Sequence, residues 1–273
     1  MRMSITHATR YEYAKPVAHG LQRLRLRPKS THGQNVQEWT MALDGAKVEV
    51  EYEDHNSNST TLVSIEPDVT QVTVTCSGKV ETADNAGVIG RHAGHMPLWG
   101  FEAQTPLTRP GVRMRALARE LDSENVDDDK VSLLHELSAR VLDGVRYEIG
   151  RTDVDTPAEH AMEAGHGVCQ DHAHVFIGIA RLLGFPARYV SGYLMMNDRI
   201  DQEAGHAWAE AFVRGLGWVG FDVSNGISPD ERYIRVATGC DYRDAAPVTG
   251  IAYGGGHSEL SVSLAVEQHI SQQ

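Results

Sequence analysis

The chain has 273 residues, of which 41% are hydrophobic, so it is long enough to bury a core without disulfides or a metal. Its formal net charge of -12 makes nucleic acid or an anionic membrane an unfavourable partner. The sequence lacks the ~18 uninterrupted apolar residues of a membrane helix, and its first residues lack the apolar region of a signal peptide. Because Cys76, Cys169 and Cys240 are widely spaced and odd in number, we expect reduced thiols in a cytoplasmic protein.

Residues 5–81 alternate between apolar and polar side chains in short runs, which is the pattern of β-strands. Turn residues such as Asp44-Gly45 separate these runs, and no helical pattern interrupts them. We therefore predict an antiparallel β-sandwich-like domain over residues 1–85. Cys76 has the same parity as the apolar residues of its strand, which places its side chain in the core of that domain.

Residues 86–110 are rich in glycine and proline and are predicted to form a connector between domains. His92 and His95 lie in this connector. No cysteine or carboxylate cluster accompanies them, so we interpret them as solvated loop histidines rather than as zinc ligands.

Two amphipathic helices begin the next predicted domain, residues 111–245. The first is predicted to start at Pro110 and to place Val112 on its buried face with the apolar residues that follow at helical spacing. The second is predicted to start at the aspartate run 127–129 and to end before Gly144. The aspartate run is more simply a helix start than a binding site.

The sequence Thr156-Pro157-Ala158-Glu159 matches a capping box and predicts a short helix with Thr156 as its N-cap. The chain then passes through the turn Gly165-His166-Gly167. Cys169 follows, and residues 173–183 are apolar nearly all round, as in a helix buried on most sides.

Cys169 therefore lies at the predicted N-terminus of a buried helix, where unpaired backbone N–H groups stabilise a thiolate. This position favours a reactive thiol, but a small buried cysteine that fills core space remains the alternative. Asp171 would oppose a neighbouring thiolate by its charge, so we assign it to capping the helix N-terminus.

Residues 187–196, 206–213 and 218–223 are predicted to be strands, and short turns between strands require antiparallel pairing. Helices therefore precede an antiparallel sheet, which predicts an α+β fold rather than a doubly wound one. The final segment, residues 246–273, alternates again at 260–266 and is predicted to add a strand to one of the two sheets.

A thiol nucleophile needs a base and a third group that orients the base. His206 begins one strand of a predicted hairpin, and Asp222 ends the other. A turn centred between residues 214 and 215 would set His206 opposite residue 223, next to Asp222. A turn centred on Leu216 would set His206 opposite residue 226. Both registers are open, and facing side chains lie about 5 Å apart. The alternative for His206 is a structural histidine that pairs with Glu210 or with the backbone.

Three motifs, Gly167-Val168-Cys169-Gln170-Asp171, Gly205-His206-Ala207-Trp208-Ala209-Glu210 and Gly217-Trp218-Val219-Gly220-Phe221-Asp222, resemble those of the bacterial transglutaminase-like superfamily of cysteine proteases. Upstream, Leu24-Arg25-Leu26 resembles the N-terminal region of its bacterial members. Downstream, Asp241-Tyr242 is similar to the closing segment. The resemblance implies a papain-like core with a Cys169, His206 and Asp222 triad, and acyl-enzyme chemistry on an amide carbonyl.

Further assignments follow from this resemblance. The backbone N–H of Cys169 and one further donor would bind the oxyanion, and the candidates for that donor are Gln170, His166 and Tyr147. Trp208 is assigned to the substrate cleft.

Two positions depart from the pattern of the family. Val223-Ser224 stands where Pro-Thr is expected, and Cys240 stands where arginine is expected. The change at Cys240 removes either a substrate contact or a structural ion pair, and the sequence leaves both open.

We therefore expect a cysteine-dependent amide-bond enzyme, a protease or amidase acting on a peptide or protein substrate without a cofactor. A protein-glutamine amine transferase and a non-catalytic binding module are the alternatives. A metal site at His166, Cys169, His172 and His174 is disfavoured, because Cys169 and His172 share a helix face whereas His174 points elsewhere.

Overall fold

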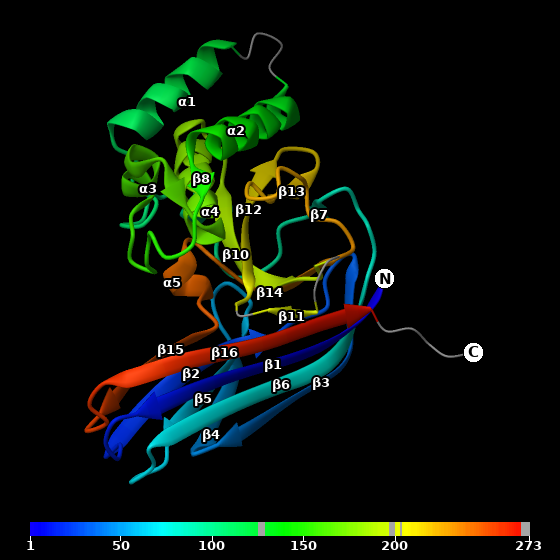
Figure 1. Ribbon diagram of the computed structural model, residues 1–273. Coiled ribbons are helices and arrows are strands. Elements are labelled where there is room, and N and C mark those ends of the chain that lie inside the picture. The colour runs from blue at the N-terminus through cyan, green and yellow to red at the C-terminus, as the bar shows by residue number, and fades with distance from the viewer. Residues whose placement is uncertain (125–128, 197–199, 203, 269–273) are drawn as a thin grey trace.

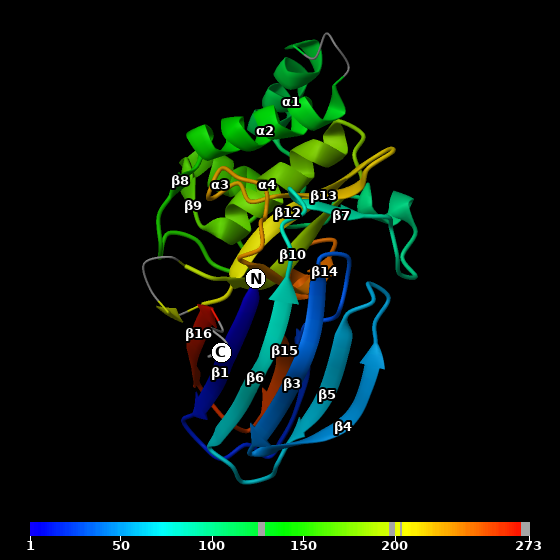
Figure 2. The ribbon, with the colours of Figure 1, turned by 90° about the vertical axis from the view of Figure 1, so that its right-hand side faces the viewer.

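Two lobes, one made of β-sheets and one in which helices cover a sheet, make up the computed structural model (Figures 1 and 2). The structure describes residues 1–273 except 125–128, 197–199, 203 and 269–273. The predicted α+β fold is confirmed, with helices preceding an antiparallel sheet in the helical lobe.

The β lobe consists of antiparallel sheets packed face to face. Their strand orders are β11-β16-β1-β6-β3 and β15-β2-β5-β4. Apolar side chains from both sheets, among them Leu24, Val63, Val74 and Cys76, meet in a buried core, which confirms the predicted sandwich and the buried position of Cys76. The strands are β1 (Arg2–Tyr13), β2 (His19–Arg27), β3 (Gln34–Asp44), β4 (Ala46–Glu53), β5 (Ser59–Ile65), β6 (Gln71–Thr82), β11 (Asp201–Gln202), β15 (Val248–Tyr253) and β16 (Ser258–Gln268).

The C-terminal segment of the chain completes this lobe, where it lies beside the N-terminal strands (Figure 1). β16 contains the predicted strand at residues 260–266 and pairs antiparallel with β1. β15, which the sequence did not predict, pairs with β2. The segment thus joins both sheets instead of one.

The helical lobe is organised around α4, which packs on β10 and β12 and is covered by α1, α2 and α3. Its sheet has the order β14-β10-β12-β13-β7. Burial on all sides explains why the sequence of α4 is apolar nearly all round. The elements are β7 (Val88–Gly90), η1 (Leu98–Phe101), α1 (Val112–Glu124), α2 (Lys130–Gly144), β8 (Arg146–Tyr147), α3 (Ala158–Ala164), β9 (His166–Gly167), α4 (Cys169–Leu182), β10 (Ala187–Leu194), β12 (His206–Val213), β13 (Gly217–Phe221), β14 (Tyr233–Gly239) and α5 (Tyr242–Ala245).

The predicted start of α2 agrees with the structure, whereas the predicted buried face of α1 does not. The carboxylate of Asp129 accepts hydrogen bonds from two backbone N–H groups of the first turn of α2, as expected of a helix start, while residues 127 and 128 lie outside the described residues. The placement of Val112 on the buried face of α1 was wrong. Val112 is 77% exposed because the buried face begins further along, at Met114.

The predicted capping box at Thr156 is also wrong. Pro157 is the N-cap residue of α3 and makes no side-chain cap. The carboxylate of Glu159 accepts hydrogen bonds instead from the backbone N–H groups of Gly111 and Arg113, at 2.7 Å each. Glu159 therefore satisfies the open N-terminus of the neighbouring helix α1, a contact that a local motif cannot predict.

The predicted connector, residues 86–110, contributes structure of its own, because β7 pairs with β13 at the edge of the sheet. His92 is half-buried rather than solvated: its Nδ1 accepts a hydrogen bond from Trp218 Nε1 at 3.2 Å, and its Nε2 lies 2.7 Å from Met96 O. His95 is exposed, as expected. None of the helices that the structure describes is long and apolar enough to span a membrane.

The two lobes share a hydrophobic cluster, in which Ile5 and Val266 of the β lobe pack with Tyr193 and Ile234 of the helical lobe. Such a shared core fixes the orientation of the lobes, because separating them would expose its apolar surface to water.

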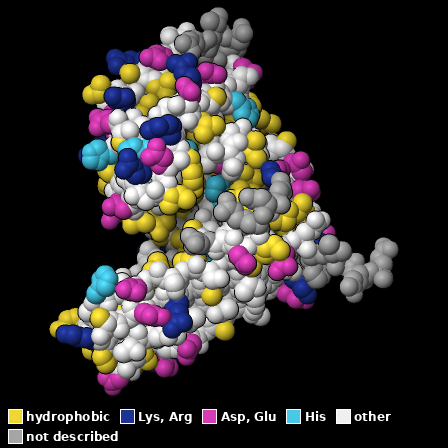
Figure 3. All heavy atoms as spheres, viewed as in Figure 1, with side chains coloured by type: hydrophobic (Ala, Val, Ile, Leu, Met, Phe, Trp, Pro, Cys, Tyr) yellow, Lys and Arg dark blue, Asp and Glu magenta, His cyan; other side chains and the backbone are white. Residues whose placement is uncertain are grey.

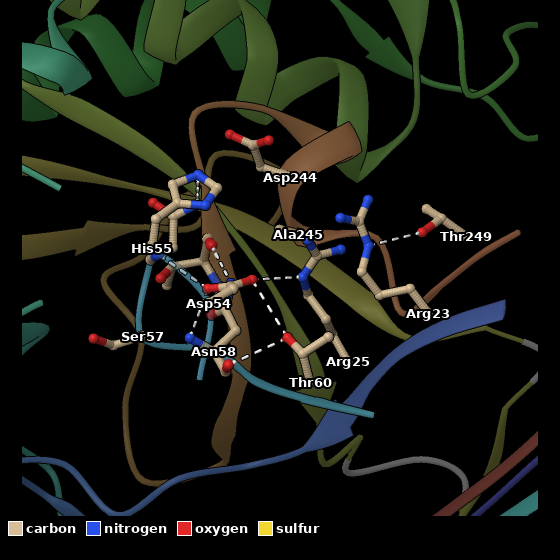
Figure 4. Close-up of polar contacts among 12 residues, drawn as sticks. Arg23, Arg25, Asp54, His55, Ser57, Asn58, Thr60, Asp244, Ala245 and Thr249 are labelled. Atoms are coloured by element: carbon tan, nitrogen blue, oxygen red, sulfur yellow. Dashed lines mark hydrogen bonds and ion pairs between the residues drawn. The ribbon is translucent and has the colours of Figure 1, made fainter. Parts of the chain in front are cut away.

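A polar contact adds to this packing (Figure 4). Asp54 accepts a hydrogen bond from Arg25 Nε at 2.9 Å and from the backbone N–H of Asn58 at 2.9 Å. The amide of Asn58 then pairs with the backbone of Thr238 in β14, donating to its carbonyl and accepting from its N–H at 2.8 Å each. All these groups are buried, so each of these contacts satisfies a polar group that water cannot reach.

Candidate active site

Cys169 is the first residue of α4 and is partly buried. Gly165 ends α3 in the left-handed conformation, with φ of 70°, and so turns the chain toward Cys169. Asp171 accepts hydrogen bonds from the backbone N–H of Val168 at 2.8 Å and from the hydroxyl of Thr152 at 2.7 Å. This bond at the start of α4 confirms the predicted capping role of Asp171.

His206 and Asp222 meet at one end of the β12–β13 hairpin. Val213 pairs with Gly217, so the turn is centred on residue 215, between the two registers considered from the sequence. β13 ends at Phe221, and Asp222 leaves the strand in a bridge to Ile227. His206 Nε2 lies 2.6 Å from Asp222 Oδ2.

The buried carboxylate of Asp222 accepts further hydrogen bonds from residues that the sequence did not indicate. The hydroxyl of Tyr233 and the side-chain amide of Asn225 each lie 2.6 Å from Oδ2. Burial alone would raise the pKa of Asp222, but the bond with His206 and these two bonds outweigh burial and lower it. Asp222 is therefore an anion beside His206. The turn residues that follow Asp222 were the one signal that could have suggested Asn225.

The electrostatics of His206 follow from its two partners. Burial would lower the pKa of the ring, but hydrogen bonds with Asp222 and Cys169 raise it to about 10. Because Nε2 faces Asp222, Nδ1 is the ring nitrogen left for the thiol. The structure thus brings the three residues of the predicted triad together, with a protonated imidazole between a carboxylate and a sulfur.

The two histidines of α4, His172 and His174, have structural partners. His172 Nε2 lies 2.6 Å from Val145 O, and its Nδ1 lies 2.8 Å from the hydroxyl of Ser224, which joins α4 to the loop that carries Asp222. Ser224, a departure from the family pattern, thus takes part in a contact. His174 is buried and accepts a hydrogen bond from the backbone N–H of Tyr242. Within the described ranges, no group of three or more His, Cys, Asp or Glu residues is placed to hold a metal ion.

Of the four residues predicted as oxyanion donors or cleft residues, one lines the cleft and three do not. Gln170 lines the cleft, but its amide donates to Val154 O at 3.2 Å. His166 and Tyr147 belong to the short β9 and β8 strands and do not line the cleft. Trp208 is buried behind His206, with ring centroids 6.2 Å apart, and does not line it either.

Cys240 is also absent from the residues that line the cleft. Its carbonyl accepts a hydrogen bond from Arg181 Nη2 at 2.7 Å. Position 240, where the family pattern has arginine, thus adjoins a buried arginine, Arg181, and it contributes no side chain to the cleft in this chain.

A cavity of about 280 Å³ lies between the lobes and reaches Cys169 and His206. Figure 3 shows a hollow at this waist, with hydrophobic side chains gathered along it. The cavity is lined by His7, Thr9, Tyr11, Arg25, Leu26, Val168, Cys169, Gln170, Tyr189, Ser191, Gly192, Tyr193, Ala204, Gly205, His206, Ala207, Val236, Tyr242, Pro247, Val248, Leu260 and Val262.

Tyr189 is a residue of this cleft that the sequence did not reveal. It lies on β10 and is 2% exposed. Burial, and then the charge of Cys169 nearby, raise its pKa well above 10, so the phenol stays protonated. Its hydroxyl makes no hydrogen bond to any residue that the structure describes, and Tyr189 lines the same cavity as Cys169. Tyr189 belongs to no local sequence motif that could have indicated its place in the cleft.

Two family models match the chain. The model of the transglutaminase-like superfamily matches residues 115–223, which contain Cys169, His206 and Asp222. The model of the bacterial transglutaminase-like N-terminal region matches residues 3–81. The chain belongs to the transglutaminase-like superfamily.

Similar proteins extend over nearly the whole chain. An uncharacterized protein of Mycobacterium leprae is 29% identical over 286 residues, which cover 97% of this chain and 98% of that protein. An uncharacterized protein of Mycobacterium tuberculosis is 29% identical over 287 residues, which cover 96% of this chain and 90% of that protein. A crystal structure titled "putative cysteine protease", from Cytophaga hutchinsonii, has a TM-score of 0.78 at 18% identity and covers 100% of this chain and 92% of its own. This structural likeness shows the fold.

The raised pKa of His206 gives a prediction for its titration. We expect the ring nitrogens of His206 to titrate near pH 10 instead of 6.5. Replacing Asp222→Asn should lower the midpoint, because the carboxylate charge is lost. Since the folded pKa exceeds the unfolded one, the stabilisation from these contacts is complete below pH 6.5 and is lost as the pH rises toward 10.

Nitrogen-detected NMR of the histidine rings, assigned with a His206→Ala variant, measures this midpoint. His7 is an internal control, because burial lowers its pKa to about 4. A wild-type midpoint for His206 at 6.5 or below would contradict the interaction with Asp222.

Proposed function

We propose that this protein is a cysteine-dependent amide hydrolase, a transglutaminase-like protease or amidase acting on peptide or protein substrates. The observation that carries the proposal is the position of His206, bonded to Asp222 and to Cys169 at a cleft between the lobes. A nucleophile, a base and a group that orients the base are the parts that thiol catalysis requires. Membership of the transglutaminase-like superfamily supports the same chemistry.

In the proposed reaction, the thiolate of Cys169 attacks the amide carbonyl carbon and forms a tetrahedral intermediate. Protonated His206 donates its proton to the leaving amine, the C–N bond breaks, and a thioester remains on Cys169. Water then attacks the thioester while His206 accepts its proton. The acid leaves, and the thiolate and imidazolium are restored. Asp222 keeps the ring oriented and stabilises its charge throughout.

The oxyanion of the intermediate needs hydrogen-bond donors that face the thiol. The backbone N–H of Cys169, at the start of α4, supplies one. We assign the second to the hydroxyl of Tyr189, because it lines the cleft near Cys169 and has no other partner among the described residues. The amide of Gln170 is engaged with Val154 instead.

Transfer of the acyl group to an amine, as in a protein-glutamine transferase, uses the same thioester and is the second candidate. We place hydrolysis first because the sequence motifs resemble those of bacterial cysteine proteases. The free state of Cys76, Cys169 and Cys240 supports the cytoplasm, a reducing compartment, as the proposed location.

Thiol labelling tests the identity of the nucleophile. With iodoacetamide at neutral pH, Cys169 should react much faster than the other cysteines, and His206→Ala should slow it by about tenfold or more. Cys76 is fully buried, and burial raises its pKa to about 12, while burial raises the pKa of Cys240 to about 11. Peptide mapping by mass spectrometry measures each rate. Equally slow labelling of all three cysteines would favour a non-catalytic binding module.

A product assay distinguishes hydrolysis from transfer. Glutamine-containing peptides are offered with and without a fluorescent primary amine, and mass spectrometry identifies the products. We expect cleaved or deamidated peptide to predominate over amine-labelled peptide, and no product from Cys169→Ala. Amine-labelled peptide as the main product would replace the hydrolase by a transferase.

The role of Tyr189 predicts a split between two measurements. Tyr189→Phe should lower kcat for amide hydrolysis by about a hundredfold, because one oxyanion donor is lost. The alkylation rate of Cys169 should stay the same, because alkylation forms no oxyanion. Tyr253→Phe, at a side chain that is 79% exposed and outside the cleft, is the matched control. If alkylation falls in parallel with kcat, Tyr189 acts on the thiol or on packing instead.

A further inference from the structure

The β lobe forms one wall of the cleft that reaches the thiol. Tyr11 on β1, Leu26 on β2, and Leu260 and Val262 on β16 line the same cavity as Cys169. The β lobe therefore contributes side chains to the candidate active site, in addition to packing against the helical lobe.

The alternation of β16 explains how one strand serves both the cleft and the contact between the lobes. Side chains two residues apart lie on the same face of a strand. On this face, Leu264 and Val266 are buried in the cluster shared by the lobes. Leu260 and Val262 continue the same face into the cleft. The apolar wall is therefore held by the packing that joins the lobes.

Among the charged and titratable residues of the lining, His7 is neutral, and the cations Arg25 and His206 each have one carboxylate partner outside the lining. Burial lowers the pKa of His7 to about 4, and its Nδ1 lies 2.8 Å from the hydroxyl of Tyr193. Arg25 Nε is bound to Asp54 at 2.9 Å, and its buried Nη1 has no hydrogen-bond partner among the described residues. Among the described lining residues there is no carboxylate, and the charge of His206 faces Asp222. A cationic substrate side chain would thus lose water in this cleft without gaining a partner of opposite charge.

We propose that this cleft binds the acyl side of the substrate and selects an apolar side chain, such as leucine or phenylalanine, next to the amide that Cys169 attacks. The inference rests on the proposed function, because it takes Cys169 as the nucleophile. A volume of about 280 Å³ is at the small end for ligand sites and suits one or two residues rather than a long segment. Full burial of such a side chain favours an apolar substrate by about ten- to a hundredfold over a cationic one.

Acetyl-aminoacyl chloromethyl ketones that carry leucine, phenylalanine, serine, glutamate or lysine side chains test this specificity without turnover. The thiolate of Cys169 displaces chloride and forms a C–S bond, so the second-order rate of alkylation reports how well each side chain is accepted. For the wild-type protein, we expect the leucine and phenylalanine reagents to react at least about tenfold faster than the lysine reagent.

Matched variants place the selectivity in the β lobe. Leu260→Glu introduces a charge at a side chain that is already 56% exposed, so folding should persist. This variant should slow the leucine reagent several-fold and raise the relative rate of the lysine reagent. Ile251→Glu makes the same kind of change on β15, at a side chain that is 74% exposed and outside the cleft, and should leave both rates unchanged.

The outcomes separate this inference from the proposed function. If Cys169 reacts much faster than Cys76 and Cys240 but with no preference among the reagents, the apolar specificity is overturned and the nucleophile stands. If the preference persists unchanged in Leu260→Glu, the wall formed by the β lobe is overturned. If Cys169 reacts no faster than the other cysteines with any reagent, the proposed function itself fails. The wild-type comparison needs no variant to fold.

Discussion

The buried carboxylate of Asp222 is the constraint around which the site is built. Burying an unpaired carboxylate is costly, so its oxygens must be satisfied from within the fold. Here His206 from β12, Tyr233 from β14 and Asn225 from the following loop converge on it. This set of bonds keeps Asp222 ionised and fixes the imidazole ring that faces Cys169. The same bonds require β12, β13 and β14 to adopt one relative position, so stability and the geometry of the site depend on the same atoms.

Two further contacts carry this geometry outward. The bond between His172 and Ser224 ties the nucleophile helix to the loop that carries Asp222. The cluster shared by the lobes and the pairing of Asn58 with Thr238 hold the β sandwich against the sheet of the helical lobe. A wall held in this way presents a preorganised surface, which reduces the ordering cost of binding.

The sequence predicted what depends on local pattern. Strand alternation, the apolar helix after Cys169 and the motifs around His206 and Asp222 indicated the fold and the residues that the structure brings together. Contacts set by distant segments were not predictable. Glu159 caps α1 rather than its own helix, and the hairpin turn lies between the two registers that spacing allowed. Tyr189 and Tyr233 lie in buried strands and belong to no local motif, so only the fold reveals what surrounds their hydroxyls.

The apolar character of the cleft and the proposed chemistry reinforce each other. A hydrogen bond is stronger where water is excluded, so donors aimed at a developing oxyanion gain most in an apolar site. The Tyr189 hydroxyl and the first N–H of α4 would act in such surroundings, because His7 is neutral and Arg25 is paired with Asp54. An apolar substrate side chain would complete the exclusion of water when it enters the cleft. Selectivity for that side chain and stabilisation of the oxyanion would then have one physical cause, the low polarity of the wall contributed by the β lobe.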